Sequence, residues 1–450
     1  MSKEYDLLVI GAGMAGTTAA NKCAITGWRV GIVDALPYGG TCALRGCDPK
    51  KILRRGAEVI DAAHRMRDKG IAENGLSIDW SALMRHKRGF TDAVPQGMED
   101  ELIGNGVTTF HGNARFTGPN QLEIDGTEHR AKRFLIAAGA RPRPLSFPGH
   151  ERLIDSTDFL NLDTLPQRIV FVGGGFISFE FAHIAARAGV DCVIIDHGDR
   201  PLREFDPDLV ELLVKKTEQT GIRVQRASTI TGVTRTVSGL TVTGEVGGKS
   251  FTIGADLVVH GAGRVPNLDG LNLDAADIAF GPQGVTVAGH LQSTTNRAVF
   301  AAGDAADTPG KPLTPVAVFE GKVAASNMLT GATTVPDYTA VPTTVFTIPE
   351  LNRVGILEQE ARDSGLDFSV RRSDTSGWYS NYRVGETTAG AKIIIDTTTD
   401  QILGAHLLGP GYAELINIFG LAIKLGLTSR QLKSMTATYP SIGSDLGSML

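Results

Sequence analysis

Residues 6–34 read DLLVIGAGMAGTTAANKCAITGWRVGIVD and place a glycine-rich turn between two apolar runs. The pattern predicts a buried strand, a turn, a helix of small residues and a second strand. The turn holds Gly11, Gly13 and Gly16, and the second strand ends in Asp34. The first glycine permits a tight bend, the second lets a pyrophosphate approach the backbone, and the third allows close packing of helix on strand. An acid at the end of the second strand can bind a ribose diol, so the stretch predicts a dinucleotide-binding βαβ unit.

The same arrangement starts again at residue 168, in RIVFVGGGFISFEFAHIAARAGVDCVIID. Gly173 and Gly175 take the first two glycine positions, Ser178 replaces the third, and Asp196 ends the second strand. Two such units predict an α/β protein with two Rossmann-like dinucleotide-binding domains.

Cys42 and Cys47 lie just beyond the first unit, in GGTCALRGCDPKK (residues 39–51). A regular helix separates Cα atoms five residues apart by about 7.5 Å, which exceeds the roughly 7 Å that a disulfide spans. If the two cysteines form a disulfide, the segment therefore cannot be a plain helix, and nearby glycines give the backbone the freedom to distort. We expect Asp48 to be the N-cap of a helix that runs to about Lys69.

The bulk composition limits where the protein works and what it binds. The chain has 450 residues, four cysteines and a formal net charge of −5, which gives no sign of nucleic-acid binding. Its N-terminus, MSKEYDLLVIGAG, lacks a secretory signal pattern, and no long apolar run predicts a membrane span. We therefore expect a cytoplasmic protein in a reducing compartment, where a disulfide is more often catalytic than structural. The cysteine spacing does not supply the ligand set of a structural zinc site, so no metal is expected.

Two dinucleotide sites and a thiol pair together predict a path for electrons. Electrons would pass from one dinucleotide to the other and then to sulfur, which requires a flavin at one site and a nicotinamide at the other. Four further motifs accompany these stretches: GNARF (112–116) and FLIAAGARP (134–142) before the second unit, and GRVPN (263–267) and FAAGD (300–304) after it. With them the chain resembles, over essentially its whole length, the class I pyridine nucleotide-disulfide oxidoreductases, which include glutathione reductase, dihydrolipoamide dehydrogenase and mercuric reductase.

The resemblance implies a domain order and two cofactor sites. FAD would bind a domain formed by residues 1–149 and 266–334, NAD(P)H would bind residues 150–265, and an α+β domain, residues 335–450, would form a homodimer whose subunits share the active site. The implied FAD site comprises Gly11, Gly13, Gly16, Asp34, Gly40, Thr41, Lys51, Gly112, Gly139, Arg264, Gly303 and Asp304. The implied NAD(P) site comprises Gly173, Gly175, Phe176, Ser178, Asp196, His197, Arg203 and Gly263.

The residues around the second site favour NADH in one respect and NADPH in another. Asp196 suits NADH, because a carboxylate accepts the ribose 2′-OH and repels a 2′-phosphate. His197 and Arg203 fall where relatives that use NADPH bind that phosphate, and the balance slightly favours NADPH.

The resemblance also assigns roles near the flavin. Cys47 would face the isoalloxazine, and Cys42 would attack the acceptor. Lys51 would lie beside the flavin, paired with Glu180, and Phe176 would cover the nicotinamide pocket.

The C-terminus, TATYPSIGSDLGSML (436–450), departs from the family. Disulfide reductases of this class carry a His-Pro-Thr-x-x-Glu element here, whose histidine protonates the leaving thiolate in the other subunit. Tyr439 replaces the histidine, Ser444 replaces the glutamate, and Asp445 follows one residue late. A tyrosine of pKa about 10 protonates a thiolate of pKa about 8.5 uphill, by about 2 kcal/mol.

The departure narrows the expected reaction without naming the acceptor. We expect an NAD(P)H-dependent enzyme that reduces a small acceptor, most simply a disulfide with a good leaving group. Glutathione is disfavoured because Asn21 stands where glutathione reductases place a substrate-binding arginine. The alternatives are a reductase of thiophilic metal ions, direct reduction of a quinone or oxygen by the flavin, and a degenerate flavoprotein that senses redox state.

Overall fold

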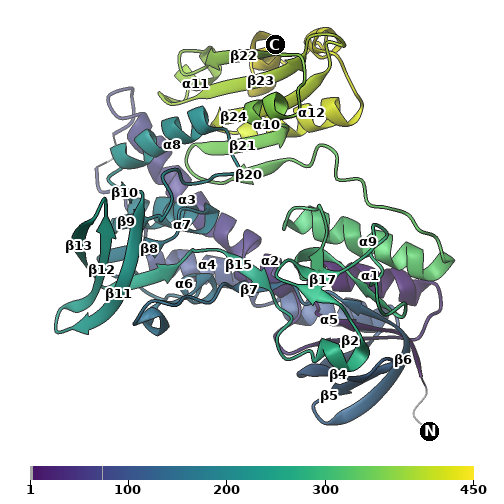
Figure 1. The fold of residues 1–450 in the computed structure, drawn as a ribbon. Helices are drawn as coiled ribbons and strands as arrows, with labels where there is room; N and C mark the ends of the chain where they lie inside the picture. Colours follow the sequence, from purple (N-terminus) through teal and green to yellow (C-terminus); the bar gives the residue numbers. More distant parts are fainter. Residues whose placement is uncertain (1–3, 73) are drawn as a thin grey trace. The chain divides into compact units, whose positions relative to one another are not determined.

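The structure is a computed structural model that describes residues 4–72 and 74–450 (Figure 1). The chain divides into two compact units, each assembled from three stretches of sequence. Unit 1 holds the described residues of Met1–Lys51, Arg85–Pro144 and Gly263–Tyr338. Unit 2 holds the described residues of Ile52–Met84, Leu145–Ala262 and Thr339–Leu450. Residues far apart in sequence therefore meet within each unit.

Unit 1 is built on a sheet whose strands follow the order β3-β2-β1-β6-β5-β4, with β18 also paired to β6. The strands are β1 (Tyr5–Ile10), β2 (Val30–Asp34), β3 (Thr108–His111), β4 (Ala114–Gly118), β5 (Gln121–Ile124), β6 (Thr127–Ile136) and β18 (Val299–Ala301). The pairs among β1, β2, β3, β6 and β18 are parallel, whereas β4 and β5 join the sheet as antiparallel strands. The parallel part contains the first predicted βαβ unit, residues 6–34.

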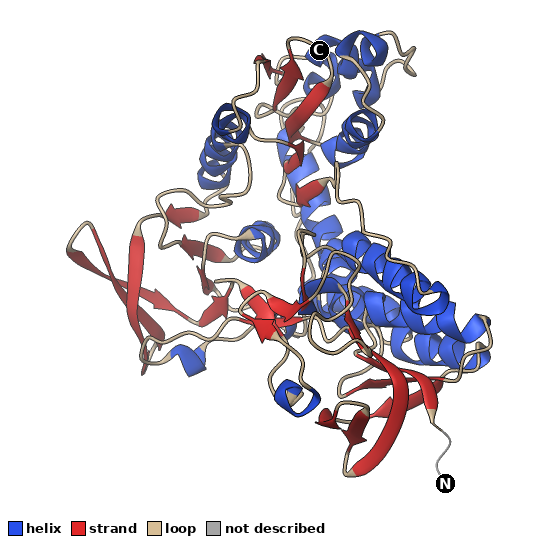
Figure 2. Cartoon of the chain, turned by 45° about the vertical axis from the view of Figure 1, so that its right-hand side comes forward, coloured by secondary structure: helices blue, strands red, loops and turns tan. Residues whose placement is uncertain are grey.

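Both faces of this sheet are buried, because side chains alternate along each strand. Leu7 and Val9 pack in one apolar cluster with small residues of two helices, and Leu8 and Ile10 pack in a second cluster on the other face. The two helices, α1 (Met14–Ile25) and α9 (Thr314–Thr330), lie side by side (Figures 1 and 2). This pairing brings residues near 314 close to the glycine-rich turn.

The rest of unit 1 consists of short elements that connect these layers. Its other helical elements are α2 (Gly40–Arg45), α5 (Val94–Gly104), η2 (Leu273–Ala276) and η3 (Gly303–Ala305). Its small sheets pair β7 (Ala140–Pro142) with β15 (Arg264–Pro266), and β16 (Phe280–Gly281) and β19 (Ala306–Asp307) with β17 (Gly284–Thr286). Helices α3 (Cys47–Arg65) and α4 (Trp80–Thr91) contribute residues to both units.

Unit 2 contains the second predicted βαβ unit. Its parallel sheet has the order β10-β9-β8-β14. The strands are β8 (Arg168–Val172), β9 (Asp191–Ile195), β10 (Arg223–Gln225) and β14 (Leu257–His260). The helical elements are η1 (His150–Arg152), α6 (Ser156–Phe159), α7 (Phe176–Arg187) and α8 (Pro207–Gln219). An antiparallel meander of β11 (Ser228–Thr236), β12 (Gly239–Val246) and β13 (Lys249–Ala255) completes this part.

The C-terminal part of unit 2 is an antiparallel sheet of order β20-β21-β24-β23-β22. The strands are β20 (Thr343–Val345), β21 (Glu350–Gly355), β22 (Phe368–Asp374), β23 (Gly390–Asp396) and β24 (Ile402–Gly409). The helices are α10 (Glu358–Asp363), α11 (Tyr379–Tyr382), α12 (Tyr412–Lys424), α13 (Ser429–Lys433), η4 (Ile442–Asp445) and α14 (Leu446–Met449).

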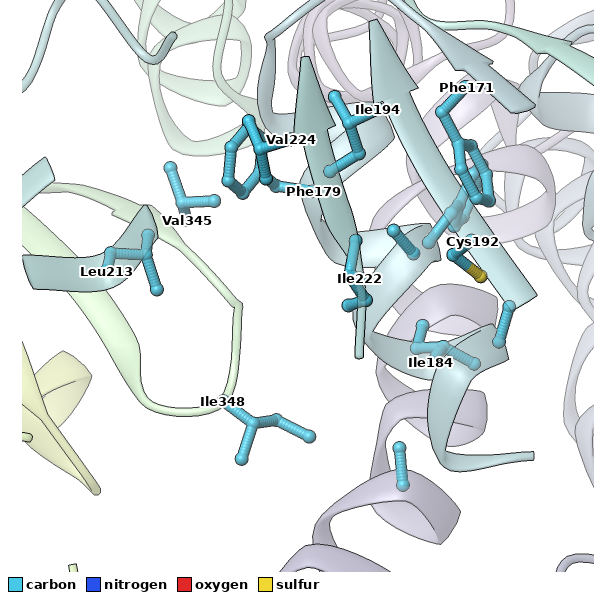
Figure 3. Packing of buried hydrophobic residues seen from close by; sticks show 14 of the residues in the cluster. Phe171, Phe179, Ile184, Cys192, Ile194, Leu213, Ile222, Val224, Val345 and Ile348 are labelled. Atoms are coloured by element: carbon cyan, nitrogen blue, oxygen red, sulfur yellow. The ribbon is translucent and has the colours of Figure 1, made fainter. Parts of the chain in front are cut away.

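One apolar core joins the two parts of unit 2. Val345 and Ile348 lie in the same buried cluster as Phe179 of α7 and Leu213 of α8 (Figure 3). The parallel βαβ arrangement in each unit confirms the predicted α/β fold class. Among the described residues, no helix is both long enough and apolar enough to cross a bilayer.

Candidate active site

The first glycine-rich turn is packed so closely that Gly11 and Gly16 cannot carry side chains. A Cβ on Gly11, whose φ is +103°, would lie 2.3 Å from the carbonyl oxygen of Ala137. A Cβ on Gly16 would lie 1.9 Å from the carbonyl oxygen of Gly11. These distances are below any real contact of a Cβ atom, so the turn can exist in this form only with glycine.

The start of α1 has the features that a dinucleotide needs. Gly13 is the N-cap and has no side chain to satisfy the first amide groups of the helix, which leaves them available to a pyrophosphate. The carboxylate of Asp34 accepts a hydrogen bond from the backbone N–H of Ala12 at 2.8 Å and so holds the turn at the end of β2. The residues present therefore fit the dinucleotide that the glycine pattern predicts.

Other predicted FAD residues meet at this turn from distant parts of unit 1. The N–H of Gly112 donates to the carbonyl of Asp34 at 3.0 Å. Asp304 is mostly buried, which raises the pKa of its carboxyl group, while the nearby charge of Arg264 acts to lower it. The Arg264 guanidinium donates to the carbonyl of Ala140, one residue beyond Gly139. These contacts bring the predicted residues together, and their roles toward FAD stay a prediction.

The two cysteines belong to successive helices, Cys42 to α2 and Cys47 to the start of α3, and α2 begins against the glycine-rich turn. A Cβ on Gly40, at the start of α2, would lie 2.6 Å from the Cα of Gly13. Helix α2 ends at Arg45, and α3 begins at Cys47 after a break at Gly46, where φ is −149° and ψ is −109°. The segment is thus a broken helix, as the disulfide argument requires.

The start and end of this helix differ from the prediction. Asp48 lies in the first turn of α3 instead of capping it, because the break at Gly46 lets the helix begin at Cys47. The helix ends at Arg65, not near Lys69. Both expectations were wrong.

The two thiols of the pair are hydrogen-bonded to each other, and their pKa values are shifted in opposite directions. The hydrogen bond with Cys47 raises the pKa of Cys42, and desolvation adds to this effect. The same hydrogen bond lowers the pKa of Cys47 to about 6, although desolvation opposes it. The Thr314 hydroxyl and the charges of Lys51 and Lys50 lower the pKa of Cys47 further. Cys42 therefore holds the proton, and Cys47 is the thiolate near neutral pH.

Thr314 is a residue that the sequence reasoning missed. Its hydroxyl lies 3.7 Å from the Cys47 sulfur, although the two residues are 267 positions apart. The available signal was the run Leu313-Thr314-Pro315, because a proline after a threonine is typical of the start of a helix. The structure places α9 so that its first turn meets the cysteine pair.

Two predicted residues near the flavin, Lys51 and Glu180, belong to different units. Lys51 is the last residue of unit 1, and its charge acts on Cys47. Glu180 is buried in α7 of unit 2, where its carboxylate accepts a hydrogen bond from the N–H of Phe346 at 3.1 Å. The contact between Lys51 and Glu180 stays a prediction. Thr41, another predicted FAD residue, is exposed on α2.

The second glycine-rich turn compensates for its missing third glycine. Ser178 is fully buried, and its hydroxyl has no hydrogen-bond partner among the described residues. A Cβ on Gly261 would lie 2.0 Å from the Ser178 hydroxyl oxygen, so Gly261 gives the room that the serine occupies. Gly173 repeats the geometry of Gly11, with φ of +104° and a Cβ position 2.5 Å from the carbonyl oxygen of Gly261.

The end of β9 carries charges of both signs. Asp196 is buried, and its carboxylate accepts a hydrogen bond from the N–H of Gly174 at 3.1 Å. His197 lies 3.5 Å from that carboxylate and is exposed. The Arg203 side chain lies over the backbone of Gly198, where an added Cβ would approach its guanidinium. The structure thus brings these predicted NAD(P) residues together.

The three other predicted NAD(P) residues lie at two places in the chain, two at the start of α7 and one after β14. Phe176, the first residue of α7, is 48% exposed, so it does not belong to the core, and its role as a cover over the nicotinamide stays a prediction. Gly175 is the N-cap of the same helix. Gly263 belongs to unit 1, whereas the other predicted NAD(P) residues belong to unit 2.

The residues that replace the C-terminal His-Glu element are not arranged as an acid–base pair. Tyr439 is 77% exposed. The Ser444 hydroxyl donates to the carbonyl of Ser441 within a capping box. The Asp445 carboxylate accepts a hydrogen bond from the Ser380 hydroxyl. Ser444 and Asp445 therefore hold the local structure instead of orienting a proton donor.

The remaining cysteines are unsuited to redox chemistry. Cys23 is buried in α1, and desolvation raises the pKa of its thiol to about 12. Cys192 lies in the apolar cluster with Phe171, Ile184 and Ile222, and burial raises its pKa as well (Figure 3).

Comparisons with known proteins agree with this arrangement. The family description "Pyridine nucleotide-disulphide oxidoreductase" matches residues 5–321, and that of the dimerisation domain of the same family matches residues 341–449. The chain belongs to this family. A dihydrolipoyl dehydrogenase of Geobacillus stearothermophilus is 31% identical over 445 residues, which cover 98% of this chain and 94% of the relative. A mercuric reductase of Bacillus cereus is 30% identical over 446 residues, which cover 98% of this chain and 70% of the relative.

Membership in the family establishes the general chemistry. Like its homologues, the chain is an oxidoreductase that uses FAD and NAD(P)H and has a redox-active cysteine pair. The dimerisation domain supports a homodimer.

Proposed function

We propose that the protein is an NADPH-dependent disulfide reductase that acts on a small disulfide other than glutathione. FAD, when bound, supplies a carrier that takes a hydride from the nicotinamide and passes an electron pair to the cysteine pair. The observation that supports the proposal most strongly is the hydrogen-bonded pair of thiols, in which Cys42 keeps its proton while Cys47 is a thiolate.

The two thiols can carry out disulfide exchange in two balanced steps. Cys42, after giving its proton to Cys47, attacks one sulfur of the acceptor, forms a mixed disulfide and releases the first thiolate. Cys47 then loses that proton to solvent and attacks the Cys42 sulfur, which releases the second thiolate and restores the Cys42–Cys47 disulfide. The acceptor gains two electrons, and its two thiolates take protons from solvent.

The leaving group must be a weak base, because the structure offers no strong proton donor from the C-terminal element. Ser444 and Asp445 are held in local hydrogen bonds, and general acid catalysis of this kind commonly contributes about 10² to 10⁴ in rate. A disulfide whose thiols have a low pKa needs less of this help.

Glutathione disulfide is disfavoured by the contacts of Asn21. Its amide donates to the Glu101 carboxylate at 2.8 Å, and its carbonyl oxygen accepts from Asn105 at 3.1 Å. The Asn21 side chain is therefore committed to holding α1 against the α5 region and carries no charge for an anionic substrate.

The charges after β9 support NADPH as the donor. Arg203 and His197 are exposed, whereas the Asp196 carboxylate is buried against the glycine-rich turn. An arginine near the end of this strand accommodates the 2′-phosphate of NADPH, a group that NADH lacks.

A reductase of thiophilic metal ions is the second candidate. Relatives named mercuric reductase match this chain along nearly its whole length, and two adjacent thiols suit a soft metal ion. Reduction of a bound metal ion also needs no proton for a leaving group, which agrees with the missing histidine.

Turnover of Cys42→Ser with a panel of acceptors tests the proposal. We expect NADPH-dependent reduction of an aromatic disulfide and of lipoamide to fall at least about 10³-fold, because the attacking thiol is lost. The control is Cys23→Ala, which removes a buried thiol outside the site and leaves these rates within about twofold.

The same panel separates the alternatives. Activity of the wild-type protein with Hg(II) but with no disulfide would favour the metal reductase. Equal rates of quinone or oxygen reduction by wild type and Cys42→Ser, with no disulfide activity, would contradict the proposal. Slow turnover with every acceptor, combined with a reversible change of the thiol pair, would indicate a sensor.

A further inference from the structure

Glu320 is a buried carboxylate of α9 that belongs to none of the predicted sites. Its side chain is almost fully buried, with 1% of the residue exposed. One carboxylate oxygen accepts a hydrogen bond from the backbone N–H of Gly303 at 2.6 Å. The other accepts from the hydroxyls of Thr308 at 2.7 Å and Tyr338 at 2.6 Å. Three donors from separate parts of unit 1 thus converge on a single side chain.

The hydrogen bonds explain how a carboxylate persists in this position. Burial raises the pKa of Glu320, and the hydrogen bonds from Tyr338, Thr308 and Gly303 act to lower it. Such bonds to a charged acceptor are stronger than bonds between neutral groups. Loss of the carboxylate would leave buried donors unpaired, so the contacts constrain all three segments together.

The first of these segments carries the acid expected to bind the flavin. Gly303 precedes Asp304 in η3, and φ of Gly303 is +68°. The hydrogen bond from its N–H fixes the backbone from which the Asp304 side chain extends. Asp304 is also close enough to raise the pKa of Glu320, so two carboxyl groups share one region of the structure.

The second segment is the loop that leads from η3 to the start of α9. Thr308 anchors this loop, and an added Cβ on Gly310 would lie 2.8 Å from a Glu320 carboxylate oxygen. The loop therefore lies directly against the carboxylate. It ends at Thr314, whose hydroxyl contacts the Cys47 sulfur.

The third segment ends at Tyr338, the last residue of unit 1. Its hydroxyl is held by the same carboxylate oxygen as Thr308. Glu320 thus fixes both sides of α9, because Gly303 and Thr308 precede the helix and Tyr338 follows it.

We propose that Glu320 is a positioning residue for the flavin site, which holds Asp304 and Thr314 in register through hydrogen bonds to Gly303 and Thr308. Tyr338 supports it by fixing the orientation of the carboxylate. The inference rests on the proposed function in one respect, namely that Asp304 faces FAD and that Cys47 is the thiolate beside it.

The test compares Glu320→Gln, Tyr338→Phe and Ser326→Ala as purified holoproteins. Ser326 lies on the same helix and accepts a hydrogen bond from Lys22, so Ser326→Ala is a matched loss of a hydrogen bond remote from Gly303. FAD release on dilution is followed by the rise of free-flavin fluorescence, which gives the FAD dissociation constant. The pH midpoint of the Cys47 thiolate is measured by its absorbance against oxidised flavin.

We expect Glu320→Gln to raise the FAD dissociation constant about tenfold or more, because an amide cannot accept from all three donors. Tyr338→Phe should raise it about threefold, since one donor is lost, and Ser326→Ala should leave it unchanged. The thiolate midpoint should shift in Glu320→Gln and stay constant in Ser326→Ala, which loss of stability alone would not produce.

Unchanged FAD affinity in a folded Glu320→Gln would overturn the inference. If Glu320→Gln fails to fold, Tyr338→Phe decides, and wild-type FAD affinity in that variant would count against the proposal. A wild-type protein that binds FAD without any thiolate absorbance would contradict the proposed function and leave the comparison of FAD affinities to judge Glu320.

Discussion

Cys47 owes its acidity to side chains from three places in the sequence. Cys42 donates a hydrogen bond to it, Lys50 and Lys51 follow it in α3, and Thr314 reaches it from the start of α9. A thiol usually has a pKa near 8.5, whereas the pKa of Cys47 is lowered to about 6. The cysteine spacing alone predicts a reactive pair, but the acidity depends on contacts that only the folded chain makes.

The lowered pKa predicts a pH dependence of the reduced enzyme. The thiolate absorbance against oxidised flavin should be full above pH 7 and should disappear as the pH falls through about 6, because protonation removes the negative charge of Cys47. Thr314→Val should move the midpoint upward by about one unit, since a hydrogen bond to a charged group contributes about 1.5 kcal/mol, close to one pKa unit.

The control for this measurement is Thr330→Val, at the far end of the same helix. Its hydroxyl donates to the carbonyl of Ser326 and accepts from the N–H of Ala332, both at this end of the helix, so the midpoint should not move. Equal midpoints in Thr314→Val and wild type would show that the hydroxyl does not stabilise the thiolate.

At the scale of elements, the glycine patterns predicted both βαβ units because glycines such as Gly11 and Gly173 are required locally, where φ is positive and the backbone leaves no room for a Cβ. Asp48 was misplaced because N-cap preference favours aspartate there, whereas the break at Gly46 sets the start of α3 two residues earlier, at Cys47 instead of Pro49. The run at Thr314 indicates only the start of a helix, and no local pattern links Thr314 or Glu320 to the site. Their partners lie elsewhere in the chain, and only the packing of α9 on α1 brings them to the site.

The contact between Ser178 and Gly261 gives a prediction about the second unit. Gly261→Ala should destabilise the protein by about 1 to 3 kcal/mol, the usual cost of overpacking, because the new Cβ would lie 2.0 Å from the Ser178 hydroxyl. The double variant Gly261→Ala with Ser178→Gly removes that hydroxyl and should recover most of the loss. Denaturant unfolding of both variants measures the two effects.

The prediction has a built-in control in Ser178→Gly alone. This variant should cost about 1 kcal/mol, as glycine does within a helix. If the double variant is less stable than Gly261→Ala, the two residues do not compete for the same space.

At the scale of the whole molecule, the dimerisation domain carries much exposed apolar surface. Tyr382, Leu421, Leu425 and Tyr439 are each more than half exposed. Such surface is expected where a second subunit packs. Three points stay predictions: the sharing of the active site between subunits, the role of Tyr439 and the domain boundaries. The first two depend on a partner subunit, and the third depends on long-range packing, which sequence patterns do not encode.

Anaerobic titration of the purified holoprotein with NADPH, and separately with NADH, tests most directly whether Cys47 is coupled to bound FAD. We predict a long-wavelength band of thiolate against oxidised flavin after about two electrons per subunit, stronger with NADPH and absent in Cys47→Ser. Bleaching of the flavin in the wild-type protein without this band would contradict the coupling of the cysteine pair to FAD.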